Sequence, residues 1–304
     1  MAGPSTAGPP RARERIIMIA FLGMGLLGSN FTRALRRRGE AVRIWNRSAA
    51  RAKAVAAETG AVAVEEAAEA VRGADRVHLV VADDAAVDDV LERARPGLAA
   101  GTPIVDHTTT TPGGAAERVR RWGERGHPFQ HAPVFMGPMQ ALEAQGVMLA
   151  SGDKALFDRL EPELAKMTGK LTWVGPEPGK AAAYKLMGNQ FLIAITAGLA
   201  DTFALAKAMG LGPADVEALF GTFNPGPSIP VRLKRIQSGD YSKPSWSLAM
   251  ARKDARLMLE ASQQGGVPLM ALPSIAAAMD RWLAAGHGGD DWTVIGRDGV
   301  TPRE

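Results

Sequence analysis

The first half of the chain alternates short apolar runs with longer stretches in which apolar positions recur every three or four residues. Short apolar runs are typical of buried parallel strands, and the longer pattern is typical of amphipathic helices. Their alternation predicts a doubly wound parallel sheet covered by helices, an α/β fold. The expected strands are 15–21, 41–45, 61–64, 76–82, 103–106, 129–134, 147–151 and 171–174, with helices at 25–38, 48–59 and 153–167.

After Pro176 the pattern becomes helical throughout. The stretch 180–209 is apolar nearly all round its middle, and a helix of this kind is buried on all sides. We therefore expect an all-helical domain that packs against a partner subunit. Further helices are expected at 213–220, 247–264 and 272–285. The predicted organisation is a disordered tail at 1–14, an α/β domain at 15–176, an all-helical domain at 177–296 and a tail at 297–304.

Composition excludes several function classes. The chain has 304 residues and no cysteine, which rules out disulfides, thiolate metal sites and cysteine nucleophiles. The net charge of +4 is small, and the basic runs at 36–38 and 118–125 are expected to be solvated helix faces rather than a nucleic-acid interface. The N-terminus lacks the apolar core of a signal peptide, and the apolar stretch 186–200 is short for a membrane span. We expect a soluble, cytoplasmic protein.

A glycine-rich turn follows the first expected strand and opens the first expected helix. Its spacing, G-x-G-x-x-G, in a strand–turn–helix context predicts dinucleotide binding. The first glycine permits the turn, the second lets a pyrophosphate approach, and the third allows close packing of helix and strand. A tight turn without a ligand is the structural alternative. The cofactor-binding residues expected in this turn are Gly23, Met24, Gly25, Leu26, Leu27 and Gly28.

The second expected strand ends in Asn46, Arg47 and Ser48, where an NAD-dependent enzyme usually has an acidic residue. An acid would repel a 2′-phosphate, whereas a guanidinium can bind it bidentately. These three residues therefore predict NADP as the cofactor, although Arg47 could instead be a solvated residue at the start of a helix. Ala82 and Asp83 follow the fourth expected strand and should run past a ribose of the cofactor.

Three more segments carry chemistry: DHTTTTP at 106–112, GKAAAYKLMGN at 179–189 and RKDARLML at 252–259. With the glycine turn, their order and spacing resemble the β-hydroxyacid dehydrogenase family. That family includes 3-hydroxyisobutyrate dehydrogenases and glyoxylate/succinic semialdehyde reductases, and imine reductases are its relatives. The resemblance runs from about Ile16 to Gly296. It implies a Rossmann-type NADP-binding domain followed by a helical domain like that of 6-phosphogluconate dehydrogenase.

The first of these segments matches the family's D-x-S-T-x-x-P motif, with Thr in place of Ser. The resemblance implies that the Thr108 hydroxyl meets a substrate carboxylate and that Thr109 contacts the cofactor. The alternative is a run of β-branched residues before a proline at the first helical position. Lys253, in the family's Lys-Asp pair, is implied to lie near the nicotinamide, and an exposed charge pair is its alternative.

Lys185 and Asn189 match the end of the family's G-x-G-x-x-x-K-x-x-x-N pattern, in which Ala181 replaces the second glycine. Residues four apart share one helix face, so both can reach one substrate oxygen. A lysine with a pKa near ~10.4 is an ammonium at neutral pH and can protonate a carbonyl oxygen as hydride reaches the carbon. The resemblance implies this catalytic role. The alternatives are a surface lysine that lies along its helix and a helix–helix hydrogen bond from Asn189.

The substrate loop departs from the family pattern A-P-V-S-G-G. Phe135 and Met136 replace the serine and the first glycine, and Gln140 replaces a later glycine. The changes remove a hydroxyl donor and narrow the approach to a site expected to include Gly137 as well. We therefore expect a more apolar pocket that depends less on a carboxylate. The alternative is that both large side chains pack against the helical domain.

The sequence thus predicts an NADP(H)-dependent oxidoreductase acting between a small aldehyde or keto acid and a hydroxy acid, as a homodimer or homotetramer. An imine reductase is the second hypothesis: Phe135 and Met136 favour it, whereas Lys185 argues against it, because such relatives usually have Asp or Tyr at that position. A non-catalytic NADP-binding module is the third. The five histidines are too scattered to predict a metal site. The natural substrate stays open.

Overall fold

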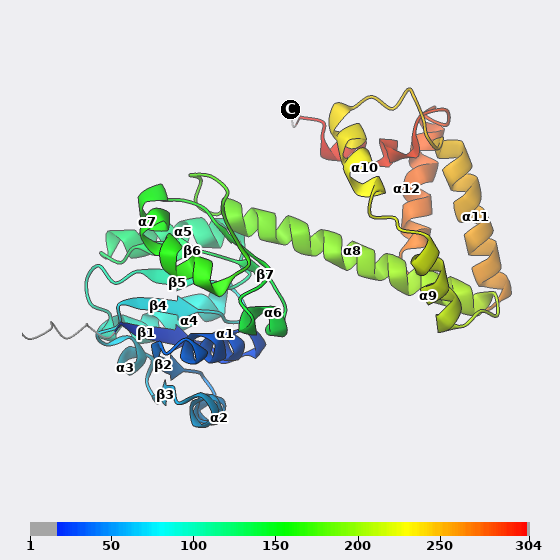
Figure 1. Cartoon of the computed structure of the whole chain (residues 1–304). Coiled ribbons are helices and arrows are strands. Elements are labelled where there is room, and N and C mark those ends of the chain that lie inside the picture. Colours follow the sequence, from blue (N-terminus) through cyan, green and yellow to red (C-terminus); the bar gives the residue numbers. More distant parts are fainter. Residues whose placement is uncertain (1–16, 303–304) are drawn as a thin grey trace, which may run out of the picture. The chain divides into compact units, whose positions relative to one another are not determined.

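The computed structural model describes residues 17–302, so the expected tail at 1–14 lies outside the described residues. The chain divides into two compact units after Asn189. The division falls inside α8 (Lys180–Ala208), whereas the sequence pattern placed a domain boundary at 176. Figure 1 labels the elements of each unit.

The amino-terminal unit is built on a parallel sheet. Its strand order is β3-β2-β1-β4-β5-β6, so the doubly wound sheet predicted from the sequence is confirmed. The order changes direction between β1 and β4, and ligands of such folds bind beyond the carboxyl ends of the strands at that point. The strands are β1 (Met18–Leu22), β2 (Ala41–Trp45), β3 (Val62–Ala63), β4 (Arg76–Leu79), β5 (Ile104–Asp106) and β6 (Phe129–His131).

Helices cover both faces of this sheet because side chains alternate along each strand. Phe21 packs in a core with Phe31 of α1, whereas its neighbour Leu22 packs in a second core with Leu91 of α4. The helices of the first core are α1 (Leu26–Arg37), α2 (Ala49–Thr59) and α7 (Lys154–Leu164). Those of the second are α3 (Ala67–Val71), α4 (Asp84–Ala94) and α5 (Pro112–Glu124). Short helical turns follow α4 and α7 at η1 (Arg95–Gly97) and η2 (Ala165–Met167).

The expected single strand at 129–134 is two strands. Pro133 cannot donate a backbone hydrogen bond to a ladder, and the chain leaves the parallel sheet at this residue. It continues as β7 (Val134–Phe135), which pairs antiparallel with β8 (Val147–Ala150), and β8 pairs in parallel with β9 (Lys170–Trp173). Helix α6 (Pro138–Leu142) follows β7. The break therefore places the substrate loop at the start of a second, three-stranded sheet.

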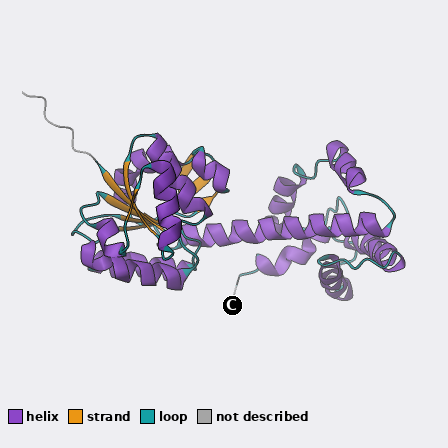
Figure 2. Cartoon of the chain, turned by 90° about the horizontal axis from the view of Figure 1, so that it is seen from below, coloured by secondary structure: helices purple, strands orange, loops and turns teal. Residues whose placement is uncertain are grey.

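The carboxy-terminal unit is built of helices, as the sequence predicted (Figure 2). Asp201 of α8 accepts hydrogen bonds from the backbone N–H groups of Met270 (2.6 Å), Ala271 (2.9 Å) and Leu272 (2.8 Å), which satisfies the start of the last α-helix. Its further elements are α9 (Pro213–Thr222), α10 (Ser228–Ser238), α11 (Leu248–Gln264), α12 (Leu272–Ala284) and η3 (Trp292–Gly299). The sequence pattern missed α10, and η3 continues past the expected domain end at 296.

Helix α8 is apolar but largely exposed in the single chain. Among the described helices it is the one long and apolar enough to cross a membrane by length and composition, a test that core helices of soluble proteins also pass. Many of its large apolar side chains are at least one-third exposed. Its exposed large apolar residues are Leu186, Met187, Phe191, Leu192, Ile193, Ile195, Leu199 and Phe203.

Candidate active site

The three glycines of the turn after β1 differ in the way the motif requires. Gly23 has φ +99°, and a Cβ there would lie 2.2 Å from the carbonyl oxygen of Val80. A Cβ on Gly28 would lie 1.8 Å from the carbonyl oxygen of Gly23, so helix and turn are in direct backbone contact. A Cβ on Gly25 would meet nothing within 4 Å. Gly25 therefore leaves open space at the N-terminus of α1, where a pyrophosphate fits.

This turn lines a cavity of about 580 Å³ at the carboxyl ends of β1, β2 and β4. A cavity of this size suits a small-molecule or cofactor site. Of the predicted cofactor residues it includes Gly23, Gly25, Leu26, Leu27, Gly28, Asn46, Arg47 and Ala82, and it includes Met136 of the predicted substrate loop. The residues present fit a dinucleotide: the cavity combines an open glycine, the start of a helix of twelve residues and two guanidinium groups.

Arg47 and Arg51 supply those guanidinium groups. Both are exposed, both line the cavity, and neither has an ion pair among the described residues. Arg51 lies in the first turn of α2, whereas Arg47 precedes the Ser48 N-cap, so a second basic residue shortly after Arg47 was the sequence signal that could have identified Arg51. Ser48, the N-cap of α2, makes no capping hydrogen bond with its side chain. This end of the cavity is therefore positively charged.

Several predicted cofactor residues also have structural roles around the turn. The Asn46 side chain accepts a hydrogen bond from the Met24 N–H (2.9 Å) and donates to the carbonyl of Ser48 (3.1 Å). It thereby ties the glycine turn to the end of β2. Met24 is buried in the first core. Asp83 caps α4 through the Ala86 N–H (2.8 Å), so its carboxylate is engaged in the helix start.

Thr108 and Thr109 lie at the carboxyl end of β5. Thr108 is fully buried, and its hydroxyl accepts a hydrogen bond from the Val81 N–H (3.1 Å) of the loop after β4. Thr109 is exposed. The Thr108 hydroxyl therefore joins two loops of the crevice, and its role toward a substrate stays a prediction.

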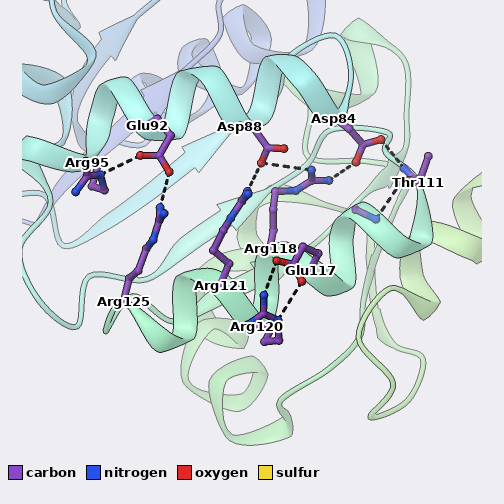
Figure 3. A network of polar contacts seen from close by, with 11 residues as sticks. Asp84, Asp88, Glu92, Arg95, Thr111, Glu117, Arg118, Arg120, Arg121 and Arg125 are labelled. Atoms are coloured by element: carbon purple, nitrogen blue, oxygen red, sulfur yellow. Dashed lines mark hydrogen bonds and ion pairs between the residues drawn. The ribbon is translucent and has the colours of Figure 1, made fainter.

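The same two loops are joined a second time by Asp84 (Figure 3). Its carboxylate accepts hydrogen bonds from the Thr111 N–H (2.9 Å) and from Arg118 (2.6 Å). Burial would raise the pKa of the Asp84 carboxyl, but these hydrogen bonds outweigh it and lower the pKa below its ordinary value. Asp84 thus stays an anion that fixes the loop carrying the threonines.

The interpretation of 118–125 as a solvated face is wrong for Arg118. Its side chain is 1% exposed and is paired with Asp84 and Asp88 of α4. A buried guanidinium needs such partners because it carries its charge at every accessible pH. The sequence pattern missed this pairing because the acids lie on another helix, thirty or more positions away. Arg120, by contrast, is exposed and pairs with acids of its own helix.

Lys185, near the start of α8, contacts the substrate loop. The helix is anchored one turn earlier, where the Ala181 N–H donates to the Ser151 hydroxyl (3.0 Å). The Lys185 Nζ lies 4.3 Å from the centroid of the Phe135 ring, a cation–π contact. Both side chains are partly buried, and burial lowers the pKa of the lysine below its ordinary value. The structure therefore brings together the predicted catalytic lysine and one predicted substrate residue.

Gly188 makes this contact possible. A Cβ on Gly188 would lie 2.4 Å from the edge of the Phe135 ring, so only glycine leaves room for the ring one turn beyond Lys185. Asn189 lies on the same helix, and Lys253 lies on α11 of the other unit in an ion pair with Asp254 (2.5 Å). The roles of Asn189 and Lys253 stay predictions.

A buried chain of hydrogen bonds connects β4 to Ala132, the residue at the start of the substrate loop. Arg76 donates to His78 Nε2 (3.1 Å), His78 Nδ1 pairs with His107 Nε2 (3.0 Å), and His107 Nδ1 pairs with the carbonyl oxygen of Ala132 (2.8 Å). A guanidinium only donates and a carbonyl only accepts. Both histidines must therefore be neutral and carry their proton on Nδ1. Burial lowers the pKa of both, that of His107 to about 4.

Comparison with known proteins agrees with this geometry. Residues 18–175 match the NAD binding domain of 6-phosphogluconate dehydrogenase, more than half of the chain. Residues 177–297 match the C-terminal domain of NADPH-dependent reductive aminase-like proteins. The chain belongs to the β-hydroxyacid dehydrogenase family. It is an NAD(P)-dependent oxidoreductase with a Rossmann-type domain, as the order of its motifs predicted.

Individual relatives cover nearly the whole chain. 2-(Hydroxymethyl)glutarate dehydrogenase of Eubacterium barkeri is 26% identical over 93% of this chain and 94% of its own. 3-Sulfolactaldehyde reductase of Escherichia coli is 26% identical over 91% and 94%. The structure of an imine reductase from Myxococcus stipitatus with NADP⁺ covers 92% of this chain and 99% of its own with a TM-score of 0.85, at 21% identity. That last likeness shows a shared fold.

Proposed function

We propose that the protein is an NADPH-dependent reductase of a small carbonyl compound and that Lys185 is its proton donor. The observation that carries the proposal is the half-buried Lys185 ammonium, which faces the Phe135 ring at the substrate loop. A solvated lysine on a helix surface would be neither covered by a ring nor lowered in pKa by burial.

The chain's own residues suit the proton-transfer half of such a reaction. A reduced nicotinamide supplies a hydride when it is bound. Lys185 donates its proton to the carbonyl oxygen, so that a carbonyl becomes an alcohol, and the neutral amine then takes a proton from solvent. Phe135 excludes water on one side of the ammonium, which strengthens its hydrogen bond to the substrate. Asn189, one turn later, would orient the same oxygen.

The choice of NADPH over NADH is supported by charge. Arg47 and Arg51 line the adenosine end of the cavity without an acidic partner among the described residues. A 2′-phosphate offers both of them an anion, whereas the ribose hydroxyl of NAD does not.

The substrate class follows from the relatives. Named relatives act on hydroxy acids or small aldehydes, as their names 2-(hydroxymethyl)glutarate dehydrogenase and 3-sulfolactaldehyde reductase state. We infer a small aldehyde or keto acid, with the reaction reversible toward the hydroxy compound.

Imine reduction is the second candidate. It is supported by the match of 177–297 to a reductive aminase-like domain and by the bulky Phe135 and Met136 in the substrate loop. Lys185 weighs against it, because an ammonium repels the iminium cation that must accept the hydride.

The oligomer is proposed from α8. Its apolar residues are exposed in the single chain, and a second copy of the chain would cover them. We infer a homodimer or a multiple of it, which light scattering would test: a monomer would contradict this inference.

A substrate panel tests the proposed function. NADPH oxidation is followed at equal concentrations of glyoxylate, succinic semialdehyde, tartronate semialdehyde, a bulky aldehyde and a cyclic imine. We expect turnover with an aldehyde. Turnover with the imine alone would favour the second candidate, and none with any compound would favour a non-catalytic module.

A further inference from the structure

Two groups of the substrate loop that could hold an anion are replaced or engaged. The position where the family pattern has serine is Phe135, whose ring lies against Lys185. The side chain that covers the lysine is therefore a hydrocarbon that cannot donate a hydrogen bond. A carboxylate brought to this place would give up water and gain no partner from the ring.

One backbone donor of the loop is also engaged. The Gly137 N–H donates to the side-chain oxygen of Gln140 (2.7 Å), the residue that replaces a family glycine. With glycine at this position the N–H would be free for a ligand. The Gln140 side-chain oxygen thus accepts the hydrogen bond that the Gly137 N–H could otherwise donate to an anionic substrate group.

The remaining hydroxyl is buried. Thr108 has no exposed surface, and its oxygen ties the loop after β5 to the Val81 N–H of the loop after β4. The family serine is thus replaced, the Gly137 N–H is engaged and the Thr108 hydroxyl is buried.

From these contacts we infer that the site selects neutral carbonyl compounds with an apolar substituent and discriminates against those that carry a carboxylate. Phe135 and Gln140 are the specificity-determining residues, and Gly188 is the positioning residue that leaves room for the ring. This inference rests on the proposed function and narrows it, because the proposed substrate class includes keto acids and the named relatives include a hydroxymethylglutarate dehydrogenase and a sulfolactaldehyde reductase.

The kinetic test uses two substrates, succinic semialdehyde and its methyl ester, which differ in charge and by one methyl group. We expect wild type to have a kcat/KM for the ester at least about tenfold above that for the acid, the scale of one unmade charge-assisted hydrogen bond. F135S/Q140G, which restores a hydroxyl and frees the Gly137 N–H, should lower this ratio at least about tenfold. An ester-to-acid ratio at or below one in wild type would overturn the inference.

Two further variants separate bulk from charge effects. F135L keeps a hydrocarbon over the lysine, so it should keep most of the preference for the ester. F223S removes an exposed phenylalanine from the other unit and should leave the ratio unchanged. If F223S changed the ratio as much as F135S/Q140G, the effect would be non-specific and the inference would fail.

A second readout needs no activity. Reductive methylation with ¹³C-formaldehyde labels the lysine amines, and K185R identifies the Lys185 resonance. In wild type the Phe135 ring should shift this resonance upfield through its ring current, and F135L should abolish the shift. An unshifted resonance contradicts the contact itself. A shifted resonance in a protein that reduces none of the panel would reject the proposed function while the contact stands.

Discussion

The two ends of the amino-terminal unit's crevice are built in different ways. The nucleotide end is made of backbone and exposed arginines around a glycine turn, with open space at Gly25. The carbonyl end depends on side-chain contacts between residues far apart in the sequence, such as the Phe135 ring with Lys185 and the His107 ring with the Ala132 carbonyl. Substitutions at the nucleotide end should therefore change cofactor affinity without changing the stability of the fold. Substitutions at the carbonyl end should change both substrate choice and stability.

The sharpest variant at the nucleotide end is Gly25→Val. Its Cβ would meet no protein atom, so the melting temperature should stay near wild type. The side chain would occupy the space of the pyrophosphate, and losing two charge-assisted hydrogen bonds weakens binding at least about hundredfold. Fluorescence titration with NADPH measures this. Gly28→Val is the contrasting variant, because its Cβ would collide with the Gly23 carbonyl and destabilise the fold.

Acid stability tests the carbonyl end. Above pH 6.5 His107 is neutral in both the folded and the unfolded chain. Between pH 6.5 and about pH 4 it is protonated in the unfolded chain but stays neutral in the folded chain, because burial lowers its pKa to about 4. Stability should therefore fall as pH falls through this window, by up to roughly 3 kcal/mol for this residue. Urea unfolding at pH 7 and pH 4.5 measures the loss.

The matched variants are His78→Gln/His107→Gln and, as a control in the other unit, His287→Gln. The double variant should be less stable than wild type at pH 7 but lose less on acidification. If it lost as much as wild type while the control behaved like wild type, the buried histidines would not be the source of the acid sensitivity.

A smaller effect is expected for Arg47→Asp. The variant replaces a charge-assisted contact worth roughly 1.5–3 kcal/mol, so KM for NADPH should rise about ten- to hundredfold. KM for NADH, which lacks the 2′-phosphate, should change little. Equal changes for both cofactors would remove the assignment of NADPH.

The mildest prediction concerns pH and activity. Lys185 must be protonated to donate, and burial lowers its pKa from 10.5. The rate of carbonyl reduction should therefore fall as pH rises, with the midpoint below 10.5. F135S, which exposes the amine, should move the midpoint upward. A midpoint that does not move would show that Phe135 does not contribute to the lowered pKa of Lys185.

The same contrast explains what the sequence could predict. The glycine turn, the parallel α/β sheet and the positions of most helices follow from local patterns, and the structure confirms them. The Gly188 space for Phe135, the engagement of Gly137 by Gln140 and the burial of Arg118 depend on contacts between side chains of distant or differently oriented elements. Such contacts leave no periodic pattern of apolar and polar positions in the sequence. The break at Pro133 was visible in the sequence as a proline inside a strand, and only its consequence for β7 was missed.

The proposed reaction depends most on Lys185 as proton donor, and a single-turnover experiment with Lys185→Ala tests this role most directly. Enzyme loaded with NADPH is mixed with the methyl ester of succinic semialdehyde, and the absorbance of NADPH is followed with time. The account predicts that the variant binds NADPH as tightly as wild type but oxidises it at least about a hundredfold more slowly. Oxidation at the wild-type rate by Lys185→Ala would contradict it.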